Sequence, residues 1–209
     1  IVEFTIFNLS AFNKIYTEIL YKYNKNLKPV FVFPTIVIHK YYKNYLSRTF
    51  HDSDIVLMGD RNVKKLSKNE MIILKMLVNH PNKKLIDISD LLKIPPKTVL
   101  NIKRTLEKKF IIKGYSCIFN HSKIGINRNI ILLQFTNEGI REIDRFREFA
   151  RKNKEIIELV KVIGKSHIII IVESLQEINI IKEIRENFPI ESYLILKSVK
   201  IHKKRYFPG

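Results

Sequence analysis

The fifty residues from Leu66 to Tyr115 constrain the fold more than any other part of the chain, because they are typical of three short helices in succession. Ser67 stands three residues before Glu70, and this pairing is the capping box that opens many helices. The apolar residues that follow recur on one face of a helix. They are Met71, Ile72, Leu74, Leu77 and Val78. Pro81 then ends this first helix.

A second short helix is predicted from about Ile86 to Leu92, with Asp87 or Ser89 near its start. Its buried side should carry three apolar residues, namely Ile88, Leu91 and Leu92. The next residues, 94–96, read Ile-Pro-Pro and predict a tight turn. Because proline suits the first turn of a helix, the third helix should open at Pro96 and run to about Lys109.

The third helix is predicted to have an apolar face and a polar, basic face. Val99, Ile102 and Leu106 should point inward. Side chains on the other face fit hydrogen bonding to base edges and phosphates in a DNA major groove. The candidate DNA-binding residues are Lys97, Thr98, Asn101, Lys103, Arg104 and Lys108. The alternative is a packed three-helix unit whose basic residues are only a solvated face.

The segment 66–115 resembles the helix-turn-helix module of the leucine-responsive/asparagine regulators (Lrp/AsnC) of bacteria and archaea. Its exit, LEKKFIIKGY, is similar to the run with which that family leaves the recognition helix and enters an extended linker. The sequence departs from the family at two places. Phe110 stands where the family has a helix-ending glycine, and Ile102 with Lys103 reverses the usual order of a basic and an apolar residue.

The rest of the chain predicts strands and helices in the order β-α-β-β-α-β, which is the ferredoxin-like arrangement. The resemblance implies that this domain, residues 129–209, forms dimers and binds an amino-acid effector. The predicted strands are 129–136, 156–163, 167–172 and 190–200, and the predicted helices are 140–152 and 175–187.

The effector loop is the point of greatest departure from the family. Between the second and third strands the family has a glycine followed by an aromatic-aspartate pair. The residues here are Gly164, Lys165, Ser166 and His167, so the acidic residue is missing. These four residues are the effector-loop candidates, and whether the chain binds a small-molecule effector stays open.

The first 46 residues repeat the last part of the chain in weak form. A strand at Phe4–Asn8, a helix at Ser10–Asn24 and a strand at Val30–Lys40 predict a β-α-β half-domain. We expect either the second half of a preceding effector-type domain, which would make the chain a truncated one, or an N-terminal extension that packs on another domain or a partner. A half-domain of this kind needs another element to fill its sheet.

The predicted fold is therefore α+β, with a β-α-β half-domain (1–46), a linker (47–65), the helix-turn-helix module (66–115), a linker strand (116–128) and the ferredoxin-like domain (129–209). His51, Asp52 and Asp54 lie in the first linker without further clustered ligands, so we expect a solvated loop and no metal site.

Positive charge is concentrated in the helical segment. The chain has 38 Lys and Arg against 20 Asp and Glu, a net charge of +18. Residues 64–120 hold 13 basic and four acidic residues, a net charge of +9, so half of the charge lies in about a quarter of the chain. This favours phosphate contact with a steep salt dependence. A general enrichment in lysine is the alternative explanation.

Catalytic and membrane signatures are absent from the sequence. No phosphate-binding glycine loop, HExxH or nucleophile elbow occurs, and no apolar run approaches 18 residues. Cys117, the only cysteine, is expected to be a buried thiol in a reducing, cytoplasmic setting. No cofactor is predicted, and the expected partners are double-stranded DNA, a second copy of the chain and, as a further possibility, a related regulator.

Two other functions stay open. Some siroheme decarboxylases resemble the same family and use histidines to handle a tetrapyrrole, and the missing effector aspartate and His167, near the domain cleft, would fit this alternative. The chain could also be an oligomerisation adaptor that recruits another regulator through an open sheet edge and binds no DNA.

Overall fold

The computed structural model describes residues 1–3, 8–29, 31–58, 64–117 and 119–198. The chain divides into two units, residues 1–33 and residues 34–207. The first unit contains helix α1 (Leu9–Lys22), whose first turn is capped by Asn8: its side chain accepts the N–H of Ala11 at 2.8 Å. No residue of α1 is buried. The strand predicted before this helix falls mostly on residues 4–7, which are outside the described part.

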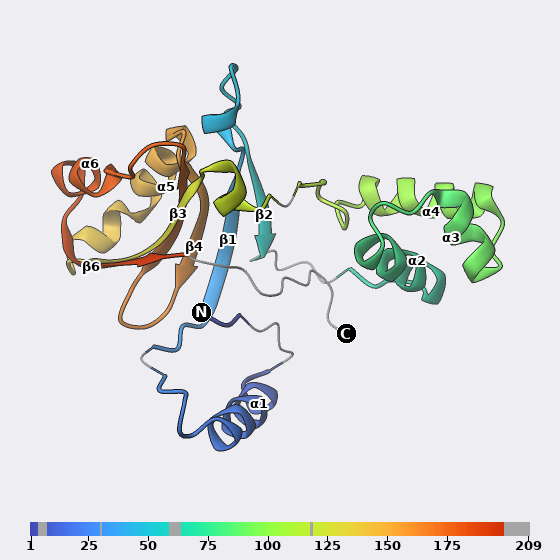
Figure 1. The fold of residues 1–209 in the computed structure, drawn as a ribbon, viewed down its shortest axis with the longest axis horizontal. Helices are drawn as coiled ribbons and strands as arrows, with labels where there is room; N and C mark the ends of the chain where they lie inside the picture. Colours follow the sequence, from blue (N-terminus) through green and yellow to red (C-terminus); the bar gives the residue numbers. More distant parts are fainter. Residues whose placement is uncertain (4–7, 30, 59–63, 118, 199–209) are drawn as a thin grey trace. The chain divides into compact units, whose positions relative to one another are not determined.

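The second unit contains a mixed α+β fold with a six-stranded, fully antiparallel sheet in the order β2-β1-β4-β5-β3-β6 (Figure 1). The strands are β1 (Thr35–Tyr41), β2 (Asp54–Met58), β3 (Asn127–Phe135), β4 (Ile156–Val162), β5 (Ile168–Ser174) and β6 (Ile190–Lys197). Three 3₁₀ turns accompany them: η1 (Asn44–Leu46), η2 (His121–Ile124) and η3 (Gly139–Glu142).

The C-terminal elements follow the predicted order β3-α5-β4-β5-α6-β6, with α5 (Ile143–Lys152) and α6 (Ile180–Asn187) packed on one face of the sheet. Phe146 and Ile184 supply the helix side of the core and have no exposed area. The α6 helix starts five residues later than predicted: the N–H of Gln176 donates to Ser174 Oγ in a bend after β5, and residues 177–179 are not helical. The strand side of this core consists of Ile131, Leu133, Phe135, Ile156, Leu159, Ile168, Ile170 and Val172.

The N-terminal strand β1 does not build a sheet of its own but extends the C-terminal one. It pairs with β4, with Ile38 opposite Val160, and β2 pairs with β1 on its other side. The segment 47–65, predicted as a linker, therefore contains a strand. The apolar residues 55–58 form it because the edge of β1 offers them backbone partners. Tyr41, at the end of β1, is 4% exposed and belongs to the core under α5 and α6.

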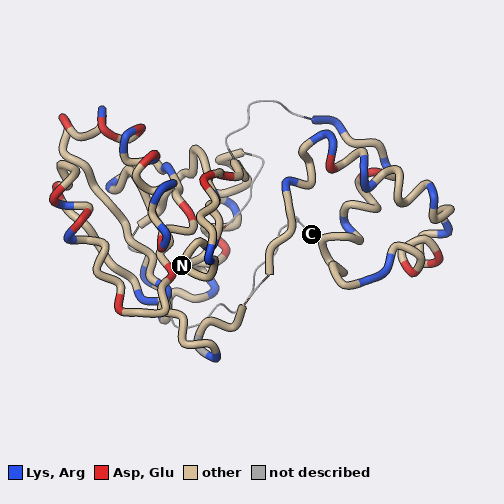
Figure 2. The backbone as a smooth tube through the Cα atoms, turned by 90° about the horizontal axis from the view of Figure 1, so that it is seen from above, with Lys and Arg blue, Asp and Glu red and all other residues tan. Residues whose placement is uncertain are grey.

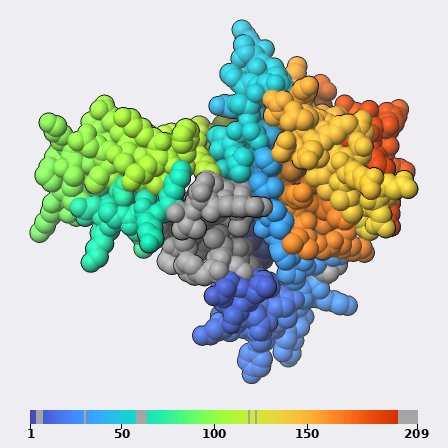
Figure 3. Space-filling model, turned by 180° about the vertical axis from the view of Figure 1, so that it is seen from behind, coloured from blue at the N-terminus to red at the C-terminus, as the bar shows by residue number. Residues whose placement is uncertain are grey.

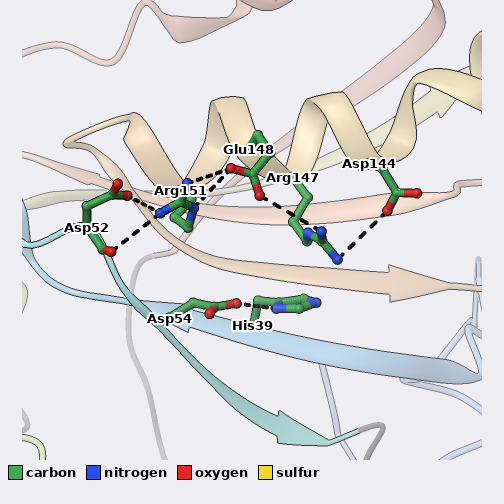
Figure 4. A network of polar contacts seen from close by, with 7 residues as sticks. All are labelled: His39, Asp52, Asp54, Asp144, Arg147, Glu148 and Arg151. Carbon is green, nitrogen blue, oxygen red and sulfur yellow. Dashed lines mark hydrogen bonds and ion pairs between the residues drawn. The ribbon is translucent and has the colours of Figure 1, made fainter.

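A row of polar contacts links the β1–β2 hairpin to α5 (Figure 4). His39 Nδ1 lies 2.5 Å from Asp54 Oδ2 across the two strands. Arg151 of α5 donates to the Asp52 carboxylate at 2.5 Å and to Glu148 at 2.5 Å. The hairpin and the β4–α5 region accordingly form one continuous surface (Figure 3). The side chains of His51, Asp52 and Asp54, the residues weighed as metal ligands in the sequence, thus form hydrogen bonds or ion pairs with other side chains of the protein.

Glu173, the penultimate residue of β5, is fully buried and joins four segments of the chain. Lys43, beside η1, and Arg128 of β3 both donate to its carboxylate. Tyr45 Oη donates at 2.7 Å and His121 Nε2 of η2 lies 2.8 Å away. Burial by itself would raise the pKa of Glu173, but the hydrogen bonds from Lys43 and Tyr45 outweigh it and hold the pKa below its usual range. The site is therefore a buried carboxylate surrounded by cationic groups.

Three helices, α2 (Lys68–Asn79), α3 (Leu85–Leu92) and α4 (Pro96–Lys108), pack together around Ile73, Ile88 and Val99. Their number, order and approximate bounds are as predicted. The buried faces differ in detail from the prediction. Ile73 is fully buried, although the apolar pattern did not include it, and Leu91, predicted to be buried, is 59% exposed. Met71 and Ile72 are also more than 40% exposed.

Candidate nucleic-acid interface

The start of α2 is fixed by the capping box that the sequence predicts. The N–H of Glu70 donates to Ser67 Oγ at 3.2 Å, and the N–H of Ser67 donates to Glu70 Oε2 at 2.8 Å. The second Glu70 oxygen accepts from Lys109, just after α4, at 2.7 Å. Hydrogen bonds from the Lys109 ammonium and from the Ser67 backbone lower the pKa of Glu70 to about 2. The ionised cap therefore ties the first helix of the bundle to the end of the third.

The turn from α3 into α4 sets the direction of the recognition-helix candidate. Lys93 ends α3 in the left-handed region, with φ 54°, and the N–H of Ile94 donates to the Ser89 carbonyl at 3.1 Å. Ser89 Oγ donates back to the Ile94 carbonyl at 2.6 Å, so Ser89 stabilises the turn and does not cap the helix. Pro96 occupies the first turn of α4 as predicted.

Four polar side chains form a continuous exposed stripe along α4. Lys97, Asn101, Arg104 and Lys108 follow the spacing i, i+4, i+7, i+11, which places them within an arc of about 60°. The buried residues Val99 and Leu106 lie on the opposite side of the helix. Among the described residues, no ion pair or side-chain hydrogen bond engages any of the four. Their donors and acceptors are therefore directed to solvent or to a ligand.

The other two candidate residues lie off this stripe. Thr98 is half-buried at its border. Lys103 lies on the opposite flank, where its ammonium is 3.5 Å from Glu107 and 5.4 Å from the centre of the Tyr115 ring. Tyr115 Oη also donates to Glu107 at 2.7 Å, and this hydrogen bond is the main cause of the lowered pKa of Glu107. Lys103 thus serves the local packing of the α4 exit in this structure.

The helical bundle is also where basic residues dominate the chain. Lys and Arg far outnumber Asp and Glu along 64–117, whereas the sheet and its helices carry both signs (Figure 2). A phosphate backbone is attracted to such a distribution over a distance of about one Debye length, roughly 8 Å at physiological salt. The stripe on α4 therefore belongs to a helical bundle with a net positive charge.

The effector-loop candidates form the tight connection between β4 and β5. Gly164 has a φ of 133°, in the region that favours glycine, and Ser166 is buried. Lys165 is exposed, and it takes part in an interaction within the protein. His167 Nδ1 accepts the backbone N–H of Phe135 at 3.0 Å, so its lone pair is already engaged within the protein.

Other chemistries find little support in the part of the chain that the structure describes. No group of three or more His, Cys, Asp or Glu side chains is arranged to hold a metal ion there. Within the same residues, no helix has the length and apolar character needed to cross a membrane. Cys117 is exposed and not buried as expected, because residues 113–117 form no strand and residues 114–117 are all exposed.

Comparison with solved structures identifies the fold. Proteins of similar structure include an AsnC family transcriptional regulator from Agrobacterium tumefaciens (TM-score 0.59, 12% identity, 69% of this chain and 97% of that one) and AsnC of E. coli (0.56, 14%, 69% and 99%). A third is the transcriptional regulator NMB0573 of Neisseria meningitidis, solved as an L-Met complex (0.56, 14%, 69% and 97%). No protein-family model and no curated protein matches the sequence. At these identities the likeness establishes the fold alone.

The comparisons also show that this chain is longer than the proteins of similar structure. The neighbours are covered almost completely, yet they account for only 69% of this chain. The sequence predicted a strand that contains most of β1, whereas β2, the pairing of the two strands and the Glu173 cluster were missed. The one available signal was an acidic residue at the end of the apolar run IIIIVES.

Proposed function

We propose that this chain, which has the fold of AsnC- and Lrp-type regulators, is a sequence-specific DNA-binding transcriptional regulator. The observation that carries the proposal is the exposed stripe Lys97, Asn101, Arg104 and Lys108 on α4. A major groove is wide enough to admit an α-helix such as α4, which has 13 residues. The side chains of the stripe provide the hydrogen-bonding groups that base edges and phosphates require.

The four side chains have different roles in this proposal. Arg104 and Asn101, in the middle of the stripe, read base edges, because guanidinium and amide groups make bidentate contacts with guanine and adenine. Lys97 and Lys108, at its two ends, contact phosphates and position the helix. Thr98 adds a hydrogen bond at the border of the stripe, and Lys103 contributes only to the general positive potential.

The proposed binding unit is a pair of chains. One α4 reaches only a few base pairs, whereas two copies related by a two-fold axis present two helices to successive major-groove faces, about 34 Å apart. The pair forms through the sheet-containing domain, residues 129–209, which carries exposed apolar side chains on its last strand. The site would then be roughly palindromic.

Selection from genomic DNA tests this function. Purified protein is mixed with genomic fragments over a salt series, and the retained fragments are sequenced. Enrichment of a symmetric site, with affinity that falls steeply as salt rises, supports a sequence-specific regulator. Retention of fragments without a shared site would contradict sequence specificity, and absence of any retention would contradict DNA binding.

A further inference from the structure

We propose that Phe110, just past the end of α4, is a further DNA-contacting residue, whose ring enters the minor groove beside the major groove that α4 occupies and inserts into a flexible base step there. This inference deepens the proposed function and rests on it, because it requires α4 to lie on duplex DNA. It assigns a base-step preference to a position outside the α4 stripe.

The backbone of Phe110 is held in a conformation that a residue with a Cβ rarely adopts. Its φ of 53° lies in the left-handed region. The N–H of Phe110 donates to the Glu107 carbonyl at 2.9 Å, and the next N–H, that of Ile111, donates to the Leu106 carbonyl at 2.9 Å. These bonds give the Cα–Cβ bond of Phe110 a fixed direction. A conformation of this kind costs free energy and is found most often where it serves a contact.

The ring of Phe110 lacks the packing that would offset this cost. It is 71% exposed, more than any other large apolar side chain that the structure describes in residues 34–198. Among the described residues, neither an aromatic ring nor a cationic group stacks on it. An apolar ring stabilises a fold when it is removed from water, and this one is not. The use of the ring therefore lies in a contact outside the chain.

Three lysines lie at the turn that carries Phe110. Lys108 is exposed and has no ion pair among the described residues. The Lys109 ammonium pairs with Glu70 at 2.7 Å and is still 45% exposed, and Lys64 donates to the Lys109 carbonyl. An exposed ring among ammonium groups fits a partner that is both anionic and rich in flat apolar surfaces, as nucleic acids are. An uncharged apolar pocket would gain nothing from these lysines.

The position of Phe110 in the chain selects the minor groove. The stripe ends at Lys108, which contacts a phosphate in the proposed complex. Phe110 follows two residues later, so its Cα lies at most about 7 Å further along the chain. It therefore reaches the sugar–phosphate strand at the edge of the major groove, and the neighbouring minor groove lies on the other side of that strand. Apolar side chains that enter a minor groove insert between base pairs and partly unstack them.

The step that accepts the ring should be a pyrimidine–purine step. Unstacking costs free energy, and the TA and CA/TG steps are the ones that unstack most readily. The Phe110 ring has no hydrogen-bonding group, so it responds to the deformability of the step and not to the base edges. Because two copies of α4 bind in the proposed complex, one such step should flank each half-site at the same distance.

Selection from a random duplex library tests the base-step preference. The wild type, Phe110→Ala and Leu91→Ala are compared at one salt concentration. Leu91, a 59% exposed apolar residue of α3, has no part in the proposed contact and provides the matched control. We expect the wild type and Leu91→Ala to enrich a TA or CA/TG step at a fixed distance from the central site. Phe110→Ala should enrich the same central site without that step.

The fluorescence of 2-aminopurine tests the insertion directly, because this adenine analogue emits more strongly when it is unstacked. It replaces, one at a time, the adenines that flank the selected site. Binding of the wild type should raise the emission at one step beside each half-site. Phe110→Leu keeps a bulky apolar side chain and should also raise it, whereas Phe110→Ala and Phe110→Gly should not.

Phe110→Gly separates DNA contact from a purely structural role. It removes both the ring and the backbone strain, so the protein should resist urea better while its affinity for the selected duplex falls about tenfold. The salt dependence of that affinity should stay as in the wild type, because the ring carries no charge. A structural role alone would make stability and affinity change in the same direction.

Three results would overturn the proposal. They are a flanking step that Phe110→Ala selects as strongly as the wild type, an emission that wild-type binding leaves unchanged at every flanking position, and an equal loss of affinity in Leu91→Ala. Each leaves the regulator intact as long as the central site is enriched. If the wild type retains no duplex at all, the regulator and the Phe110 contact are refuted together, so the two failures are distinguishable.

Discussion

The backbone N–H of Phe110 donates to the carbonyl of Glu107 at 2.9 Å, with Phe110 held at a φ of 53°. The next residue, Ile111, donates to the Leu106 carbonyl at 2.9 Å, which completes a Schellman motif at the end of α4. Glycine usually occupies this left-handed position. The Phe110 ring is 71% exposed, so packing does little to compensate the strain.

Phe110→Gly should therefore stabilise the protein by about 1 kcal/mol, because the left-handed conformation costs a residue with a Cβ roughly 1–2 kcal/mol. Urea unfolding would measure the change in the free energy of unfolding. Phe110→Ala is the control: it removes the ring but keeps the Cβ, and should have little effect. Equal stabilisation by both substitutions would locate the effect in the ring and not in the backbone.

Loss of the hydroxyl should change the free energy of unfolding in opposite directions at two tyrosines, Tyr41 in β1 and Tyr45 in η1. Among the described residues, the buried Tyr41 hydroxyl has no hydrogen-bond partner, whereas that of Tyr45 donates to Glu173. Tyr41→Phe should raise the free energy of unfolding by about 1 kcal/mol, and Tyr45→Phe should lower it by about 1.5 kcal/mol. Thermal unfolding of both variants checks the pair. Destabilisation by Tyr41→Phe would show that its hydroxyl has a partner after all.

Removal of the buried charge at Glu173 should be among the most damaging single changes. Glu173→Gln leaves Lys43 and Arg128 beside a neutral group, which costs about 3 kcal/mol. Denaturant unfolding of the full chain measures the loss, with the exposed Glu177→Gln as a neutral control. If Glu173→Gln lowers the free energy of unfolding no more than the control does, then Lys43 and Arg128 do not depend on the Glu173 charge and are hydrated by water in its place.

The capping box at Glu70 predicts a defined pH dependence. Its pKa is about 2 when folded and near 4.5 otherwise, so the stabilisation is complete above pH 5 or so and is lost as the pH falls toward 2. The melting temperature of the wild type should exceed that of Glu70→Gln at neutral pH, and the gap should narrow between roughly pH 5 and pH 2. A gap that does not change with pH would contradict the role of the ionised carboxylate.

The three helices were predictable because their signals are local. Ser67 with Glu70, and Pro96 at the start of α4, act within one turn of the chain. The stripe on α4 follows from helical spacing alone, and Lys103 falls off it because one residue turns the helix by about 100°. Burial of individual apolar residues, such as Ile73 and Leu91, depends on the crossing of α2 and α3, which spacing does not specify.

The pairing of the hairpin and the Glu173 cluster were not predictable, because they depend on contacts between residues far apart in the sequence. The pairing of β1 with β4 joins residues more than 100 positions apart, and the sequence of neither strand specifies which other strand it pairs with. The residues that contact Glu173 come from segments far apart in the sequence, and spacing along the chain does not specify that they meet. Of the expected effector loop, the sequence located the turn, whereas the bond from Phe135 to His167 depends on the neighbouring strand.

The most direct test of the central claim is the binding of α4 variants to a selected site and to random duplex over a salt series. Arg104→Ala and Asn101→Ala should each weaken the specific site by about 1 to 3 kcal/mol and random DNA much less. Lys108→Ala should weaken both duplexes similarly and lower the salt slope by about one. Equal losses on both duplexes for all three variants would contradict base reading by α4.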